Sequence, residues 1–275
     1  MNGDTLFETR RTVEHFAPQP PVAPRRVVVT GVGIATPLGS NLDTFWSAIM
    51  QGHSCISEIT RLDTSDYPVH IGGQVIEPEP GPFLPEQILR RNDLCTNIGL
   101  LAGGLALDSA HLGSREDDKR RISVVVGSAF GAMQGLQEVY DAYFTRGWRR
   151  MHPLSVPRNM FNSLASNLSI HYRLTGTHHT VAAACASGAV AIGEAFQRIR
   201  HGYDDIVLAG GADARVAGGG GPAPGLAEQD EGRIVGFENR PARVGGPVVD
   251  EDRLEPLARI GLAQNRPDAV VQDRG

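Results

Sequence analysis

The fold is indicated most clearly by residues 180–195, which read TVAAACASGAVAIGEA. The pattern predicts a strand at 179–184 that passes through small residues into a helix at 187–200. Cys185 lies at the junction of the two elements. Because the helix consists mainly of alanine, glycine, valine and isoleucine, we expect it to be buried on most sides, with other backbone segments close to it.

The chemistry of this junction centres on Cys185. A thiol at a helix N-terminus is near unpaired backbone N–H groups and the positive end of the helix dipole, and both stabilise the reactive thiolate. The same N–H groups can stabilise the oxyanion that forms when a thioester is attacked. The local pattern alone leaves two interpretations open: a nucleophile that accepts an acyl group, or a buried, inert thiol in a tightly packed turn.

The two other cysteines, Cys55 and Cys95, are interpreted as small apolar side chains. The spacing of the three cysteines fits no zinc site. Their odd number argues against a disulfide framework. We therefore expect the protein to use neither a metal nor a cofactor.

Outward from this stretch, apolar strands alternate with helices along most of the chain. Strands are predicted at 26–31, 69–75, 121–127, 179–184 and 205–209, and helices at 41–51, 93–112, 133–146, 159–170 and 187–200. This alternation is typical of a layered α/β fold with a largely buried sheet.

Two glycine-containing segments follow strands and invite a nucleotide-binding interpretation. Residues 31–36 lack the third glycine and the later acidic residue of a dinucleotide site, so a tight strand-to-loop turn is the better interpretation. Residues 127–131 lack the lysine of a phosphate loop. His178 and His179 are neighbours in a strand and point to opposite faces, so we interpret them as structural or surface residues.

The whole chain has the composition of an ordinary globular protein, with 275 residues, 41% hydrophobic content and a net charge of −5. The negative charge argues against a nucleic-acid partner, and the arginine pairs at 25–26 and 149–150 are interpreted as solvated surface. No apolar run reaches the roughly 18–20 residues that a membrane span needs. Residues 1–24 lack the apolar core of a secretory signal, so we expect a cytoplasmic protein with no membrane partner.

Composition divides the chain into three parts. Residues 1–24 form a proline-rich extension, and residues 25–214 form a domain. Residues 215–275 are rich in glycine, proline and arginine, and from Val216 onward they contain no serine, threonine, lysine or histidine, so we expect disorder. One hypothesis is that this tail is an out-of-frame reading of the gene, and the alternative is a genuine short protein with a disordered tail.

Several motifs in a fixed order carry a resemblance to a known family. They occupy residues 26–33, 37–39, 45–46, 127–131, 157–169, 183–188 and 209–213, with Leu62-Asp63 where the family has a phenylalanine–aspartate pair. Over residues 25–214 the sequence resembles the β-ketoacyl-acyl-carrier-protein synthases of the elongating type, in the thiolase-like superfamily. The resemblance implies the N-terminal half of a thiolase-like layered α/β fold, with helices around a mixed, mostly buried sheet.

The resemblance also implies a function. The protein would be a 3-oxoacyl-[acyl-carrier-protein] synthase of fatty-acid or polyketide biosynthesis, with Cys185 as the nucleophile and Phe130 in the acyl pocket. Its partners would be acyl- and malonyl-loaded acyl carrier proteins and a second copy of the chain in a homodimer. Acyl transfer to Cys185 would precede decarboxylative Claisen condensation, for which the family uses two histidines of a second half that is not found in this sequence. The alternative is a catalytically silent paralogue that binds a full-length synthase.

Overall fold

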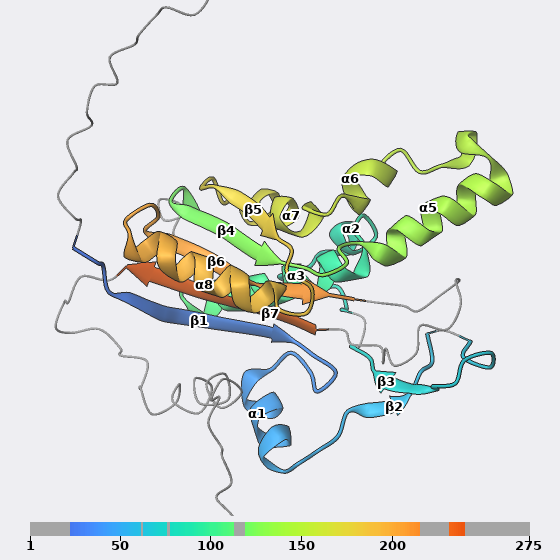
Figure 1. Cartoon of the computed structure of the whole chain (residues 1–275), viewed down its shortest axis with the longest axis horizontal. Coiled ribbons are helices and arrows are strands. Elements are labelled where there is room, and N and C mark those ends of the chain that lie inside the picture. The colour runs from blue at the N-terminus through green and yellow to red at the C-terminus, as the bar shows by residue number, and fades with distance from the viewer. Residues whose placement is uncertain (1–22, 62, 76–77, 113–118, 215–230, 240–275) are drawn as a thin grey trace, which may run out of the picture.

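A computed structural model of the chain describes residues 23–61, 63–75, 78–112, 119–214 and 231–239 (Figure 1). Its strands are β1 (Val27–Ala35), β2 (Ile56–Glu58), β3 (Ile71–Gly73), β4 (Ile122–Gly127), β5 (His178–Val181), β6 (Ile206–Asp213) and β7 (Glu231–Asn239). Its helices are α1 (Leu42–Met50), α2 (Glu86–Leu89), α3 (Leu94–Ser109), α5 (Met133–Arg146), η1 (Trp148–Arg150), α6 (Ser155–Asn159), α7 (Ser163–Tyr172) and α8 (Ser187–Arg200). Leu62 and nearly all of the predicted extension lie outside the described residues.

Five strands form one mixed sheet in the order β1-β7-β6-β4-β5. β4 runs parallel to both β5 and β6, whereas β7 is antiparallel to its neighbours β1 and β6. β2 and β3 form a separate antiparallel ladder. Because β4, β5 and β6 are parallel neighbours, their carboxyl ends meet at the same edge of the sheet, which is where parallel α/β sheets place their binding sites.

Helices cover both faces of this sheet. Figure 1 shows α8 across one face and α3 behind the other, with α7 beside it. Side chains along β4 alternate between two cores: Val124 and Val126 pack with α3 and α7, while Val125 packs with Ala191 and Ile199 of α8. The prediction of a layered α/β fold around a mixed, mostly buried sheet is confirmed.

The glycines of the first strand have a role other than the predicted turn. β1 continues through Gly31 and Gly33 as far as Ala35. A Cβ atom on Gly31 would lie 2.3 Å from the carbonyl oxygen of Ala106, and one on Gly33 would lie 1.9 Å from that of Ala102. The two glycines therefore let the α3 backbone pack directly on the strand, and the interpretation as a strand-to-loop turn is wrong.

Other predicted boundaries differ from the observed ones. The strand predicted at 205–209 continues through two glycines to Asp213. The helix predicted at 159–170 is replaced by α6 and α7, because the backbone is extended at Met160 and interrupts the helical path. The strand predicted at 69–75 is limited to the three residues of β3. No described helix has the length and apolar character needed to cross a membrane.

The structure differs from the expected disorder of residues 215–275 in one segment. Residues 231–239 form β7 in the interior of the sheet, where Val235 pairs with Val32 of β1 and with Ala209 of β6. The sequence of this segment, EGRIVGFEN, contains β-branched and aromatic residues that favour a strand. The rest of the tail, residues 215–230 and 240–275, lies outside the described residues.

Candidate active site

Cys185 lies in a sharp turn between β5 and α8, which we call the cysteine turn (residues 183–187). Ala184 adopts the left-handed conformation with φ of +49°. The amide of Ala186 donates to the carbonyl oxygen of Ala183 at 3.1 Å, and the amide of Ser187 donates to that of Ala184 at 3.0 Å. This tight geometry leaves the Cys185 side chain exposed at the start of α8. The prediction of a strand–turn–helix junction at Cys185 is confirmed.

Ser187 holds the cysteine turn from inside the protein, where the residue is only 1% exposed. Its hydroxyl oxygen accepts a hydrogen bond from the Ala183 amide at 2.8 Å. The same hydroxyl lies 2.6 Å from the carbonyl oxygen of Ala184 and 3.2 Å from that of Ser128. One side chain thus stabilises the left-handed residue and ties the turn to the loop that follows β4.

Glycines at the ends of β4 and β6 make room for the start of α8. A Cβ atom on Gly127 would lie 2.2 Å from the backbone of Ser187. One on Gly211 would lie 2.7 Å from the carbonyl oxygen of Gly127 and 2.9 Å from the Cα atom of Gly188. The helix N-terminus therefore rests on the carboxyl ends of two parallel strands, which explains why small residues occupy these positions.

Phe130 lies in the loop of residues 128–131, which we call the serine loop. The Asp213 carboxyl group, at the end of β6, accepts hydrogen bonds from the Ser128 hydroxyl at 2.7 Å and from the amides of Ala129 and Phe130 at 2.9 and 3.1 Å. The Ser128 hydroxyl in turn accepts from the Gly131 amide at 2.8 Å. The Phe130 residue is 42% exposed. The structure thus brings the serine loop and the cysteine turn together through the contact between Ser128 and Ser187.

The sequence interpretation did not assign a role to Asp213. It lies four residues after the predicted strand 205–209, in the segment 209–213, and forms the last residue of the observed β6. The available signal was an acidic residue at the carboxyl end of a buried strand, where functional side chains of α/β sheets gather. The neighbouring strand could not be identified from the sequence, because the pairing of β6 with β4 joins residues more than 80 positions apart.

The three cysteines differ in environment. Cys95 is 2% exposed, and its thiol donates to the carbonyl oxygen of Ala212 at 3.2 Å. Burial, with a smaller effect from the charges of Asp93 and Asp213, raises the pKa of the Cys95 thiol far above its usual range, so this thiol stays protonated and unreactive. Cys55 is partly buried, and Cys185 alone of the three is exposed. The interpretation of Cys95 as a small packing residue agrees with this environment.

Other polar groups near the site have structural partners. His179 of β5 lies with its Nε2 atom 2.9 Å from Glu194 Oε1 of α8. His178 is exposed. Among the residues that the structure describes, no three His, Cys, Asp or Glu side chains are arranged to hold a metal ion.

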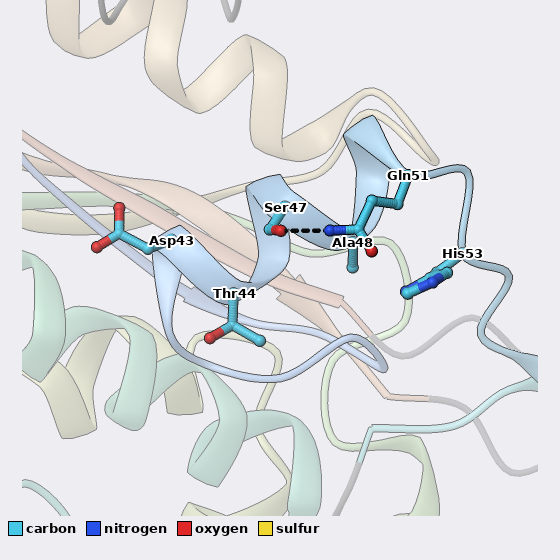
Figure 2. A pocket seen from close by; sticks show the side chains of 6 residues that line it. All are labelled: Asp43, Thr44, Ser47, Ala48, Gln51 and His53. Atoms are coloured by element: carbon cyan, nitrogen blue, oxygen red, sulfur yellow. Dashed lines mark hydrogen bonds between the residues drawn. The ribbon is translucent and has the colours of Figure 1, made fainter.

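A separate hollow of about 400 Å³ lies beside α1. Figure 2 shows the residues that line it: Asp43, Thr44, Ser47, Ala48, Gln51 and His53. Gln51 Nε2 donates to Ser47 Oγ at 2.8 Å across one side of it. The hollow contains no cysteine and lies on a helix that has no buried residue. The cysteine turn and the serine loop therefore remain the candidate active site.

Helix α8 buries only one face, through Ser187, Ala191, Ala195 and Ile199, so the expectation that it is buried on most sides is wrong. A mixed sheet between layers of helices, with an exposed cysteine at the turn into such a helix, defines the thiolase-like class of α/β proteins. Within this class the chain belongs to the beta-ketoacyl synthase family, because residues 24–221 match the family's N-terminal domain, described as "Beta-ketoacyl synthase, N-terminal domain".

Named relatives agree with this assignment. The 3-oxoacyl-[acyl-carrier-protein] synthase 2 of Coxiella burnetii is 32% identical over 189 residues, which cover 69% of this chain and 46% of the relative. The chloroplastic 3-oxoacyl-[acyl-carrier-protein] synthase I of Hordeum vulgare is 32% identical over 206 residues, covering 73% and 45%. The chain thus spans about half the length of the curated relatives it matches.

Solved structures show the same fold. The ishigamide ketosynthase/chain length factor has a TM-score of 0.69 and 26% identity, covering 78% of this chain and 59% of that one. A type II polyketide synthase acyl-carrier protein in complex with its ketosynthase has a TM-score of 0.61 at 22% identity, covering 79% and 64%, and supports the fold alone.

Proposed function

We propose that the protein is a 3-oxoacyl-[acyl-carrier-protein] synthase of fatty-acid or polyketide biosynthesis and that Cys185 accepts the acyl group. The observation that carries this proposal is the cysteine turn. It presents an exposed thiol at the N-terminus of α8, directly after the left-handed Ala184, whose carbonyl oxygen is held by the buried Ser187. A structural thiol would need neither the exposure nor the strained backbone.

The proposed first step is a transfer between thioesters. The Cys185 thiolate attacks the carbonyl carbon of an acyl thioester, and a new carbon–sulfur bond forms. The bond to the carrier's sulfur then breaks, and the carrier leaves as a thiolate that takes up a proton. The positive end of the α8 dipole favours the anionic sulfur. The amides of Ala186 and Ser187 donate within the turn, so they are not free to bind the oxyanion.

Phe130 is proposed to line the pocket for the acyl chain. It lies two residues after Ser128, whose carbonyl oxygen contacts the hydroxyl of Ser187 beside the cysteine turn. Its aromatic ring offers the apolar surface that an alkyl chain needs.

Decarboxylative condensation belongs to the second step of the proposed reaction. Loss of carbon dioxide from a malonyl thioester leaves an enolate, which attacks the acyl-cysteine carbonyl and releases the Cys185 thiolate. Developing negative charge on the enolate needs donors in fixed positions. The resemblance implies that histidines of the family's second half serve this purpose, whereas Cys185 and its turn support the acyl-transfer step.

The proposed partners are acyl- and malonyl-loaded acyl carrier proteins and a second copy of the chain. One solved neighbour of the same fold was studied as an acyl-carrier protein in complex with its ketosynthase. A homodimer is supported by exposed aromatic residues on α5, which extends from the body of the protein in Figure 1: Tyr140, Tyr143 and Phe144.

A second candidate function is that of a silent partner that binds a full-length synthase. The observation that favours it is the likeness to a ketosynthase/chain length factor structure. The exposed Cys185 favours the enzyme instead, because a partner that acts only by binding needs no accessible thiol.

Acylation of Cys185 tests the two candidates. The full chain is incubated with octanoyl-N-acetylcysteamine, and the adduct is located by mass spectrometry of peptides. We expect acylation at Cys185 at least about tenfold faster than at a free cysteine, a difference of roughly 1.4 kcal/mol in the activation barrier. Cys185→Ala should abolish the adduct, whereas the matched controls Cys55→Ser and Cys95→Ser should retain it. A rate equal to that of free cysteine would refute the nucleophile and favour the silent partner.

A further inference from the structure

The carboxyl group of Asp213 is hydrogen-bonded to the serine loop of the candidate site, and the proposed acyl transfer does not use it directly. Its carboxyl group binds three donors of the serine loop: the Ser128 hydroxyl and the amides of Ala129 and Phe130. The backbone of Ser128 then contacts the Ser187 hydroxyl, which holds the cysteine turn. A continuous chain of hydrogen bonds therefore joins the end of β6 to the residue beside Cys185.

We propose that Asp213 is a positioning residue that sets the place of Phe130 relative to Cys185 and so determines how the acyl chain is received. This inference rests on the proposed function, in which Cys185 carries the acyl group. Asp213 acts through the serine loop and not on the reacting atoms. It belongs to β6, whose register with β4 is fixed by a parallel ladder, so the carboxyl group is a rigid reference point for the loop.

The chemistry of the contact explains why an aspartate is suited to this position. Oδ1 accepts from all three donors, and Oδ2 lies 3.1 Å from the Ala129 amide. An asparagine could keep its oxygen at the Oδ1 position, but its NH2 group would then face the Ala129 N–H, and two donors repel each other. A glutamate keeps both oxygens but carries them one methylene farther from the strand. Asp213→Asn should therefore release the loop, and Asp213→Glu should retain part of its order.

The sheet offers a matched control at the opposite end of the same two strands. Ser123 of β4 donates to Asp204, just before β6, at 2.7 Å. The contact has the same chemistry and length as the one between Ser128 and Asp213, although Asp204 also pairs with Arg198, and it is far along β4 from the serine loop. A merely structural effect of removing a serine–aspartate pair should appear in both places, whereas a positioning effect should appear only for Asp213.

Hydrogen exchange of backbone amides tests the position of the loop without any enzyme assay. In the full chain, Asp213→Asn should speed exchange of the Ala129 and Phe130 amides about tenfold, since repulsion between the new NH2 group and the Ala129 N–H weakens the hydrogen bonds that hold the loop. Asp204→Asn should leave both amides unchanged. Equal exchange in Asp213→Asn and the unsubstituted chain would overturn the proposal.

Acylation kinetics then test the functional part. Asp213→Asn should raise the KM for octanoyl-N-acetylcysteamine about tenfold. The rate of Cys185 alkylation by the small reagent iodoacetamide should stay within about twofold of that of the unsubstituted chain. Asp213→Glu should reverse part of the rise in KM. If Asp213→Asn slows both the acylation of Cys185 and its alkylation by iodoacetamide, Asp213 has a structural role, and the positioning role is overturned.

Two outcomes separate this proposal from the function on which it rests. If the unsubstituted chain is not acylated at Cys185, the proposed function fails, and hydrogen exchange still decides whether Asp213 holds the loop. If Asp213→Asn does not fold, Ser128→Ala removes the hydroxyl that links Asp213 to the Gly131 amide, with Ser123→Ala as its control. Unchanged exchange at Ala129 and Phe130 in Ser128→Ala would then count against the proposal.

Discussion

Ala184 illustrates how a single residue shapes the candidate site. A non-glycine residue with positive φ is uncommon, and it persists only where its surroundings hold it. Here the Ala183 carbonyl oxygen accepts from the Ala186 amide, and the Ala184 carbonyl oxygen accepts from the buried Ser187 hydroxyl, so both peptide groups beside Ala184 have partners. The strained residue turns the chain sharply enough to expose the cysteine that follows it.

A β-branched side chain should not be tolerated at Ala184. We expect Ala184→Val to lower the free energy of unfolding by roughly 1–3 kcal/mol, because branching at Cβ clashes with the backbone in the left-handed region. Thermal unfolding and the rate of Cys185 acylation measure the effect. The matched control is Ala182→Val, since Ala182 is also exposed but has no positive φ. Equal losses in the two variants would show that the left-handed conformation of Ala184 does not govern the turn.

At the scale of elements, the buried carboxyl group of Asp93 joins two helices. It caps α3 by accepting from the Cys95 amide at 2.9 Å, and it accepts from the Gly135 amide of α5 at 2.7 Å. Burial raises the pKa of its carboxyl group, and these two hydrogen bonds oppose that rise. One side chain thereby links the first turns of two helices.

Close packing between β1 and α3 is the clearest case in which two elements depend on each other. Gly31 and Gly33 have no side chain to separate the strand from the helix backbone, and α3 itself contains several small residues along its buried length. The helix is consequently buried over most of its residues, and it covers β1, β7 and β6 on one face of the sheet.

Gly33→Ala should separate these two elements. We expect a loss of roughly 1–3 kcal/mol or more in the free energy of unfolding, since the added methyl group would meet the Ala102 carbonyl oxygen. The contrasting control is Gly193→Ala in α8, where no atom lies within 4 Å of the added methyl group. That substitution should stabilise the protein by about 0.5–1 kcal/mol, because alanine favours a helix interior. Urea unfolding of both variants tests the pair, and a stabilised Gly33→Ala would contradict the close packing.

At the scale of the whole molecule, β7 determines how the sheet holds together. β1 has β7 as its ladder partner, and β7 in turn pairs with β6. Residues close to the start of the described chain are therefore joined to the central parallel strands through residues 231–239. Loss of β7 would leave two strands with unpaired backbone groups facing each other across a gap.

Two shortened chains test this role of β7. A chain that ends at Ala214 should lose at least about 3 kcal/mol of unfolding free energy or fail to fold, since two ladders of hydrogen bonds disappear at about 0.5–1.5 kcal/mol for each bond. A chain that ends at Asn239 retains β7 and should unfold like the full chain. Denaturant unfolding followed by circular dichroism compares the three. Identical stability of all three would mean that β7 does not contribute to the sheet in solution.

The sequence by itself determined the local elements and the position of Cys185. Apolar periodicity is a short-range signal, so most strands and helices, and the junction between β5 and α8, could be predicted from neighbouring residues. Motif order was sufficient to indicate the family, which the match over residues 24–221 confirms.

Only the tertiary structure decided which distant residues meet. The glycines of β1 could not be distinguished from turn glycines until α3 was seen to cross them. Residues 231–239 have local strand propensity, but nothing in the sequence indicated that they lie between β1 and β6. Asp213 likewise gained its place only when β6 paired with β4 and brought it to Ser128. The physical reason is the same in each case: strand pairing and backbone approach depend on contacts between residues far apart in the chain, which local propensity does not encode.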